Sequence, residues 1–197
     1  RQPYDVRELL ARLIDDSDFL DFKPDFGAAT VCGHGAIEGQ PCGFIGNNGP
    51  IDPQGSNKAT QFMQLCNQSG TPLVYLQNTT GYMVGKAAEQ AGAIKHGSKM
   101  IQAVANARVP KFTIVVGGSF GAGNYGMCGR GFDPDFIFTW PSGRMGVMAG
   151  ESAVQAVHGP TLDKAAKEKK APSPDVQDAV DAERPHLARA VVVVLHE

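Results

Sequence analysis

Short apolar runs alternate with longer amphipathic segments along most of the chain. Apolar runs bounded by glycine, proline or asparagine predict β-strands. The predicted strands are Thr30–Ile37, Pro41–Asn47, Leu73–Leu76, Phe112–Val116, Phe136–Thr139 and Arg144–Met148. Because only Glu38-Gly39-Gln40 separates the first two, they are expected to form a hairpin. Leu73–Leu76 is apolar throughout, which is typical of a strand that is covered on both faces.

Helical periodicity predicts helices between these strands. Asp5-Val6-Arg7-Glu8 is a capping box that opens a short amphipathic helix. The further predicted helices run from Ser56 or Asn57 to about Gln68, over Ala87–Ala107, from the glycine-rich segment 117–123 to about Cys128, over Glu151–His158 and over Asp175–Glu183. The resulting order, β-α-β-α-β-β-α with short glycine turns, predicts a layered α/β fold.

The composition changes after Gly159-Pro160. Lys164–Lys170 is strongly charged, Pro172-Ser173-Pro174 breaks the chain, and Ala190–Leu195 is a last strand-like run. We therefore predict one domain over residues 1–158 and a peripheral helical arm with a truncated end over residues 159–197.

Charge and composition exclude several function classes. The 197 residues carry a net charge of −2, so we expect no nucleic-acid partner and no anionic membrane surface as a partner. The four cysteines lack C-x-x-C spacing, which predicts buried thiols in a reducing compartment and no metal site. The expected location is the cytoplasm, with the mitochondrial matrix as the alternative.

The glycine-rich segment Gly117–Gly126 is the strongest candidate for chemistry. It follows an apolar strand and opens a helix, whose first N–H groups have no partner within the helix. Small residues at Gly121, Ala122 and Gly123 would let a ligand oxygen approach the backbone. A phosphate loop would carry Lys-Ser/Thr where Asn124-Tyr125 stands, so an oxyanion site fits best. The alternative is that these glycines only allow the helix to pack closely on the sheet.

A second candidate turn, Asn78–Gly85, follows the strand that ends at Gln77. Because parallel strands end at one edge of an α/β sheet, the two turns are expected to share a site, unless this one is an ordinary connecting loop. The sequence contains no evident pair of nucleophile and base, and its histidines stand apart. This favours chemistry in which the backbone supplies dipoles and a cofactor supplies the reactive group.

Several segments together carry a resemblance to a known family. They are Pro3–Glu8, Gly43-x-Ile45-Gly46-Asn47-Asn48-Gly49, Leu76-Gln77-Asn78-x-x-Gly81-Tyr82-Met83-Val84-Gly85, Gly117–Arg130 and Trp140-Pro141 through Val147-Met148. The chain resembles the carboxyltransferase (beta) subunit of biotin-dependent acyl-CoA carboxylases. Within that family it is most similar to the methylcrotonoyl-CoA and geranyl-CoA carboxylase branch.

The resemblance implies a crotonase-like (ClpP/crotonase) α/β fold of repeated ββα units. It also implies a ligase-type reaction in leucine or isoprenoid catabolism, in which a carboxyl group passes from carboxybiotin to an α,β-unsaturated branched acyl-CoA, the coenzyme A thioester. The chain corresponds to the C-terminal, biotin-side domain, which we expect to be inactive alone. The implied partners are a biotin carboxylase and biotin-carrier subunit, the N-terminal carboxyltransferase domain, and further copies in a homo-oligomer.

The resemblance also implies roles for individual residues. The N–H groups of Ala122 and Gly123 would stabilise the negative urea oxygen of biotin, and Gly121 would permit its approach. The residues implied to shape the acyl pocket are Phe120, Asn124 and Tyr125, although ordinary helix packing is an equal alternative for Tyr125. The residues implied to line the biotin entrance are Asn78, Thr79, Gly81 and Tyr82.

Two other functions remain open from the sequence. One is a biotin-dependent acyl-CoA decarboxylase subunit, since the glycine turn does not reveal the direction of transfer. The other is a non-catalytic fragment that assembles the carboxylase and docks the biotin carrier.

Overall fold

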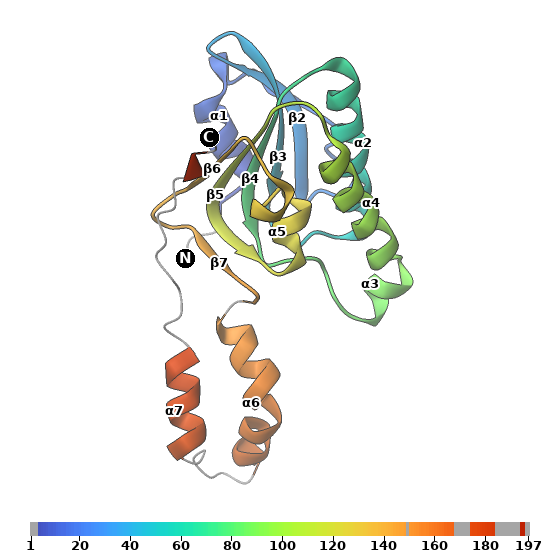
Figure 1. The fold of residues 1–197 in the computed structure, drawn as a ribbon. Coiled ribbons are helices and arrows are strands. Elements are labelled where there is room, and N and C mark those ends of the chain that lie inside the picture. The colour runs from blue at the N-terminus through green and yellow to red at the C-terminus, as the bar shows by residue number, and fades with distance from the viewer. Residues whose placement is uncertain (1–3, 149, 168–173, 184–193, 196–197) are drawn as a thin grey trace.

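A mixed β-sheet forms the centre of the computed structural model, which describes residues 4–148, 150–167, 174–183 and 194–195 (Figure 1). Its described strands follow the order β1-β2-β3-β4-β5-β6-β8, and β7 pairs with β5 beyond the end of β6. The strands are β1 (Leu20–Asp21), β2 (Thr30–Ile37), β3 (Gln40–Asn47), β4 (Leu73–Thr79), β5 (Lys111–Phe120), β6 (Phe136–Thr139), β7 (Arg144–Gly146) and β8 (Val194–Leu195). Strands β3 to β6 are mutually parallel, so β4 and β5 end at the same edge.

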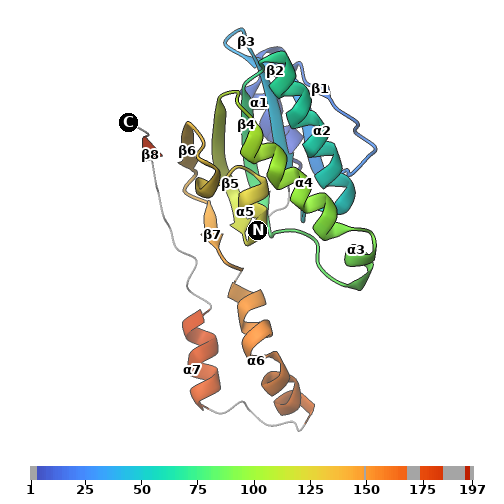
Figure 2. The ribbon, with the colours of Figure 1, turned by 45° about the vertical axis from the view of Figure 1, so that its right-hand side comes forward.

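Helices cover both faces of this sheet. The helices are α1 (Val6–Leu13), α2 (Pro53–Ser69), α3 (Lys86–Gln90), α4 (Ala93–Asn106), α5 (Ala122–Gly126), α6 (Gly150–Lys167) and α7 (Pro174–Glu183), with short 3₁₀ turns at Asp15–Ser17 and Arg130–Phe132. Figures 1 and 2 show α2 and α4 side by side on one face and α1 on the other. None of the helices in the described part of the chain is long and apolar enough to cross a membrane.

Two apolar clusters hold these layers together. The first lies under α2 and α4 and includes Phe62, Tyr75 and Met100, all fully buried. The second lies under α1 and includes Leu10 and Phe44. Burial on both faces explains why β4 reads as a continuous apolar run in the sequence, because neither of its faces meets water.

Three predicted boundaries were wrong, each because of a local contact. Helix α2 begins at Pro53, since the Asp52 side chain accepts a hydrogen bond from the Gly55 N–H and caps the helix four residues before Ser56, the earlier of the two expected caps. The single helix expected over 87–107 is divided into α3 and α4, because Gly92 adopts φ +85°. Strand β5 continues through the first glycines to Phe120, where its end pairs in parallel with β7.

The arm also differs from its predicted form. Helix α6 continues past Gly159 and includes Pro160, so it crosses the expected boundary between residues 158 and 159. Helices α6 and α7 lie side by side and point away from the sheet (Figures 1 and 2). Of the predicted strand-like run Ala190–Leu195, residues 194–195 form β8 against β6, and residues 190–193 lie outside the described residues.

Candidate active site

The chain bends sharply where β5 ends and α5 begins. Gly121 adopts φ +56° and ψ −146°, a conformation that is accessible almost only to glycine. Its N–H donates to the Gly146 carbonyl of β7 at 3.0 Å, which holds the bend in place. Among the described residues, the N–H groups of Ala122 and Gly123 donate to no acceptor. The bend therefore leaves two adjacent donors unpaired, those of Ala122 and Gly123, whereas the Gly121 N–H is occupied.

A cavity of about 540 Å³ opens beside Ala122, whereas Gly123 is buried and does not line it. Its walls include Ala122, Tyr125 and Val147, and Tyr125 is 49% exposed. The Tyr125 ring also meets the edge of Phe132 at 6.0 Å between ring centres, so it is both a packing residue and part of the wall. The mixture of backbone donors and apolar side chains suits an acyl group that carries one polar, reacting end.

The second predicted turn lies directly against α5. A Cβ added at Gly123 would stand 2.8 Å from the Gly81 Cα and 3.0 Å from the Thr79 Cγ2, so the two backbones are in contact. The Thr79 hydroxyl accepts from the Gly81 N–H at 3.1 Å and braces this turn. The structure thus brings Gly81 and Thr79 together with Gly123, in agreement with the expectation that both turns meet at one edge of the sheet.

Asn78 and Phe120 face a different cavity. The Asn78 Oδ1 accepts a hydrogen bond from the Gly118 N–H at 3.1 Å, where the register between β4 and β5 shifts. Asn78, Thr79 and Phe120 line a second cavity of about 420 Å³. Because successive side chains of a strand point to opposite faces, Ser119 borders the cavity beside α5 and Phe120 borders the other. Phe120 is therefore separated from Asn124 and Tyr125, with which the sequence had grouped it.

Tyr82 lies between two helices. Its ring contacts the positions of Gly97 in α4 and Gly126 in α5, and its hydroxyl is 3.5 Å from the Gly97 carbonyl, to which it donates. Burial raises the pKa of this hydroxyl. Tyr82 lines neither of the two cavities next to α5, so its place in a biotin entrance remains a prediction.

A buried polar network beneath α5 escaped the sequence reasoning. Gln77 of β4, Ser119 of β5 and Asn124 of α5 are joined by side-chain hydrogen bonds. The only signal for it was a glutamine at the end of an otherwise apolar strand, because a buried amide needs partners. This network occupies the amide of Asn124, which the sequence had placed in the acyl pocket.

Within the part of the chain that the structure describes, the site contains no evident side-chain nucleophile with a base. The thiols of Cys66 and Cys128 are free and buried, and burial raises the pKa of each to about 11, so they are not thiolates near neutral pH. Cys42 is only half-buried, unlike the other three cysteines. No three His, Cys, Asp or Glu side chains lie close enough to hold a metal ion in the described part of the chain.

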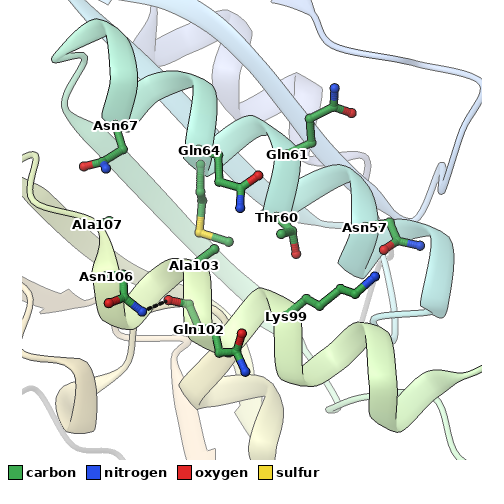
Figure 3. Close-up of a pocket in the computed structure, with 11 residues that line it drawn as sticks. Asn57, Thr60, Gln61, Gln64, Asn67, Lys99, Gln102, Ala103, Asn106 and Ala107 are labelled. Atoms are coloured by element: carbon green, nitrogen blue, oxygen red, sulfur yellow. Dashed lines mark hydrogen bonds between the residues drawn. The ribbon is translucent and has the colours of Figure 1, made fainter.

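A separate groove of about 550 Å³ runs between α2 and α4 (Figure 3). Amide side chains dominate its walls, among them Gln61, Gln64 and Gln102, and Lys99 is the one charged residue that lines it. It contains none of the predicted site residues. The candidate active site is therefore the region around the start of α5.

Comparison with known proteins identifies the family. The Carboxyl transferase domain family matches residues 1–195. The chain belongs to this family. The methylcrotonoyl-CoA carboxylase beta chain of Dictyostelium discoideum is 47% identical over 178 residues, which cover 90% of this chain and 30% of that protein.

Solved structures of relatives share the fold. The beta subunit of Pseudomonas aeruginosa geranyl-CoA carboxylase is 58% identical, with a TM-score of 0.85 over 95% of this chain and 35% of that one. The transcarboxylase 12S subunit, a hexamer solved with hydrolysed methylmalonyl-coenzyme A, is 31% identical, with a TM-score of 0.79 over 93% of this chain and 34% of that one. The α/β crotonase-like fold and the resemblance to the methylcrotonoyl-CoA and geranyl-CoA carboxylase branch are thereby confirmed. The chain spans only about a third of the length of these relatives.

Proposed function

We propose that this chain supplies the biotin-side half of a carboxyltransferase site in a biotin-dependent acyl-CoA carboxylase. The acceptor would be an α,β-unsaturated branched acyl-CoA, methylcrotonoyl-CoA or geranyl-CoA. Support comes from the family match and from identities of 47% and 58% to the two carboxylase beta subunits named for these substrates. These relatives do not favour a decarboxylase or a purely assembling fragment.

The pair of unpaired donors at the start of α5 carries this proposal. When bound, carboxybiotin supplies the carboxyl group, an oxygen that becomes negative as that group leaves, and the base for the substrate proton. Ala122 and Gly123 would donate their N–H groups to that oxygen, and Gly121 leaves room for it beside the backbone. Ala122 is exposed and lines the cavity, whereas Gly123 is buried. The absence of a protein base from this arrangement fits a reaction whose base comes with the cofactor.

The acyl pocket and the biotin entrance are proposed separately. We propose that Tyr125 forms part of the acyl wall, with Asn124 behind it, because both line the cavity next to the donors. We propose that Asn78, Thr79 and Gly81 belong to the biotin side of the site. Tyr82 and Phe120 would then support the site by packing, Tyr82 against Gly126 of α5 and Phe120 in the wall of the cavity that Asn78 and Thr79 also line. Replacing Tyr125 with alanine should change the ratio of turnover with methylcrotonoyl-CoA to turnover with geranyl-CoA; an unchanged ratio would remove it from the wall.

The proposed partners follow from the coverage of the relatives. We propose that residues 1–158 function as a domain together with an N-terminal carboxyltransferase domain, a biotin carboxylase and a biotin-carrying subunit, and that the chain alone is inactive. A homo-oligomer is proposed by analogy with the transcarboxylase 12S hexamer. We propose the cytoplasm as its location, with the mitochondrial matrix as the alternative that the name of the Dictyostelium relative suggests.

The substitution Ala122→Pro tests the oxyanion assignment directly. Proline is favoured at the first residue of a helix, where its missing N–H has no helical partner, so this variant should fold normally. In the carboxyltransferase assembled with its N-terminal domain and biotin-carrying subunit, we expect kcat to fall by about 100- to 1,000-fold. Ala122→Ser is the matched control, because it changes the side chain but keeps the N–H. Near-normal turnover of a folded Ala122→Pro enzyme would refute the assignment.

A further inference from the structure

Helix α5 is too short to determine its own direction. It has five residues, Ala122–Gly126, and a helix of one turn is unstable in isolation. The direction of the Ala122 and Gly123 N–H groups is therefore set by contacts from outside the helix. A donor that is displaced by a fraction of an ångström loses much of its effect on a transition state.

One side chain reaches both ends of this helix. Gln77 of β4 is fully buried, and its Nε2 donates to the Met127 carbonyl, immediately after α5, at 2.7 Å. Its Oε1 accepts from the Ser119 hydroxyl at 2.5 Å and lies 3.4 Å from the Nδ2 of Asn124, which also donates to it. Asn124 belongs to the first turn of α5, and Met127 follows its last residue.

The hydrogen bonds form a chain with a consistent direction. The Asn124 Nδ2 donates to the Ser119 Oγ at 2.7 Å, Ser119 donates to Gln77, and Gln77 donates to the Met127 carbonyl. Ser119 and Gln77 each both donate and accept, so removing Gln77 leaves the Ser119 hydroxyl without its acceptor and the buried Met127 carbonyl without its donor. A buried group that loses its partner costs free energy, and a shift of the one-turn helix α5 is the change we expect to restore partners.

Another buried hydrogen bond near α5 provides a comparison. Thr113 of β5 donates to the Cys128 carbonyl at 2.6 Å, so it also holds the chain just after α5. Among the described residues, the Thr113 side chain forms no hydrogen bond to the first turn of α5, whereas Gln77 bonds to Asn124 there. Loss of Thr113 should therefore weaken the fold without turning the donors.

We infer that Gln77 is a positioning residue for carboxyl transfer, which aims the Ala122 and Gly123 N–H groups by bonding to both ends of α5. This inference rests on the proposed function, because it assumes that these N–H groups act on the transition state. Gln77 itself lines neither cavity beside α5, so it acts through α5 and not by touching the substrate.

The test compares variants in the assembled carboxyltransferase with its biotin-carrying subunit. Gln77→Met keeps the approximate shape and removes all hydrogen bonds, and Gln77→Glu keeps the acceptor for Ser119 but loses the donor to Met127. We expect Gln77→Met to lower kcat by about 10- to 100-fold with KM for the acyl-CoA changed less than about twofold, because only transition-state contacts are lost. Gln77→Glu should show a loss of the same kind. Thr113→Val is the matched control. Its melting temperature should fall by about as much as that of Gln77→Met, but its kcat should stay within about twofold of the parent enzyme.

A second measurement does not depend on activity. Hydrogen exchange of the backbone amides in peptides covering residues 121–129 should accelerate in Gln77→Met and stay near the parent rate in Thr113→Val for residues 121–124. If Gln77→Met folds poorly, Ser119→Ala interrupts the same chain with little change in volume; because Ser119 also borders the cavity beside α5, its effect is judged by faster amide exchange at residues 121–124, and an unchanged exchange rate there would overturn the inference.

The outcomes separate this inference from the function on which it rests. Suppose that the parent enzyme carboxylates and the Ala122→Pro variant does not. If the kcat of Gln77→Met then equals that of Thr113→Val, the inference about Gln77 is overturned and the proposed function stands. A loss confined to KM would overturn the inference as well. A parent enzyme without carboxyl transfer would overturn the proposed function, while faster exchange at residues 121–124 in Gln77→Met would still support the role of Gln77 in holding α5.

Discussion

The contact between Tyr82 and Gly126 predicts how two substitutions should interact. A Cβ added at Gly126 would collide with the Tyr82 hydroxyl oxygen and would lie 3.1 Å from its Cζ. The ring also packs against the Gly97 backbone, since a Cβ added there would lie 3.2 Å from the Tyr82 Cε1, and its hydroxyl donates to the Gly97 carbonyl, so its room to move is limited. Gly126→Ala should therefore destabilise the protein, and removal of the hydroxyl in Tyr82→Phe should relieve most of that loss.

The magnitudes follow from three contributions. Overpacking a closed space costs about 1–3 kcal/mol, whereas alanine is better than glycine inside a helix by about 0.5–1 kcal/mol. The net loss for Gly126→Ala should be about 1–2 kcal/mol. Tyr82→Phe gives up one hydrogen bond of 3.5 Å, which at that length contributes less than about 1 kcal/mol. The double variant should have about the same free energy of unfolding as Tyr82→Phe alone. It should therefore be more stable, by about 1–2 kcal/mol, than the sum of the two single effects predicts.

Urea unfolding of the four proteins in this cycle measures the coupling. Gly49→Ala serves as the control, since a Cβ at Gly49 meets nothing within 4 Å and should show no coupling to Tyr82→Phe. Independent effects of Gly126→Ala and Tyr82→Phe, within about 0.5 kcal/mol, would contradict the packing described for Tyr82.

Three further predictions concern the bend before α5 and the buried thiols. Gly121→Ala should lower the free energy of unfolding by about 1–3 kcal/mol, because alanine strongly disfavours φ +56° with ψ −146°. Iodoacetamide at pH 8 should label Cys42 well before Cys66 and Cys128, as mass spectrometry can follow, since a thiol with a pKa of about 11 is about 0.1% thiolate there. Stability should fall as the pH rises from 9 to 11, because the unfolded thiols ionise near 9.0 and the folded thiols of Cys66 and Cys128 only near 11.

Each of these has a clear contrary result. Unchanged stability of Gly121→Ala would mean that the bend relaxes at no cost. Equal labelling of all cysteines in the folded protein would contradict their burial. For the pH series, the stabilising effect of the neutral buried thiols is complete below pH 9; a stability that stays constant up to pH 11 would contradict the raised pKa values.

Much of the fold could be predicted because its signals are local. The hairpin of β2 and β3 follows from two runs joined by Glu38-Gly39-Gln40, and β6 was predicted with its observed bounds. The wrong helix boundaries also had local causes, which overrode the helical periodicity of apolar residues. Asp52 capped α2 earlier than Ser56, and Gly92 interrupted a pattern that continued through it.

The site was predictable where the backbone forms it. Gly121, Ala122 and Gly123 were identified from their spacing after an apolar strand, and their meeting with Thr79 and Gly81 follows from the parallel order of β4 and β5. The grouping of Phe120 with Tyr125 failed, because β5 extends to residue 120 and thereby turns Phe120 to the opposite side. The extension depends on pairing with β7, which no pattern within β5 reveals.

The sequence by itself determined the α/β layers and the glycine bend before α5, since each depends on residue types within a short stretch of chain, and its motifs between Pro3 and Met148 together carried the resemblance to the family. Only the tertiary structure decided how α5 is held. Its partner Gln77 stands 47 residues before Asn124 and 50 residues before Met127. Hydrogen bonds over such separations require the sheet to be assembled first, because only then do β4, β5 and α5 bring these side chains within reach. The two unpaired donors at Ala122 and Gly123 are thus a local feature, and their direction is a property of the whole fold.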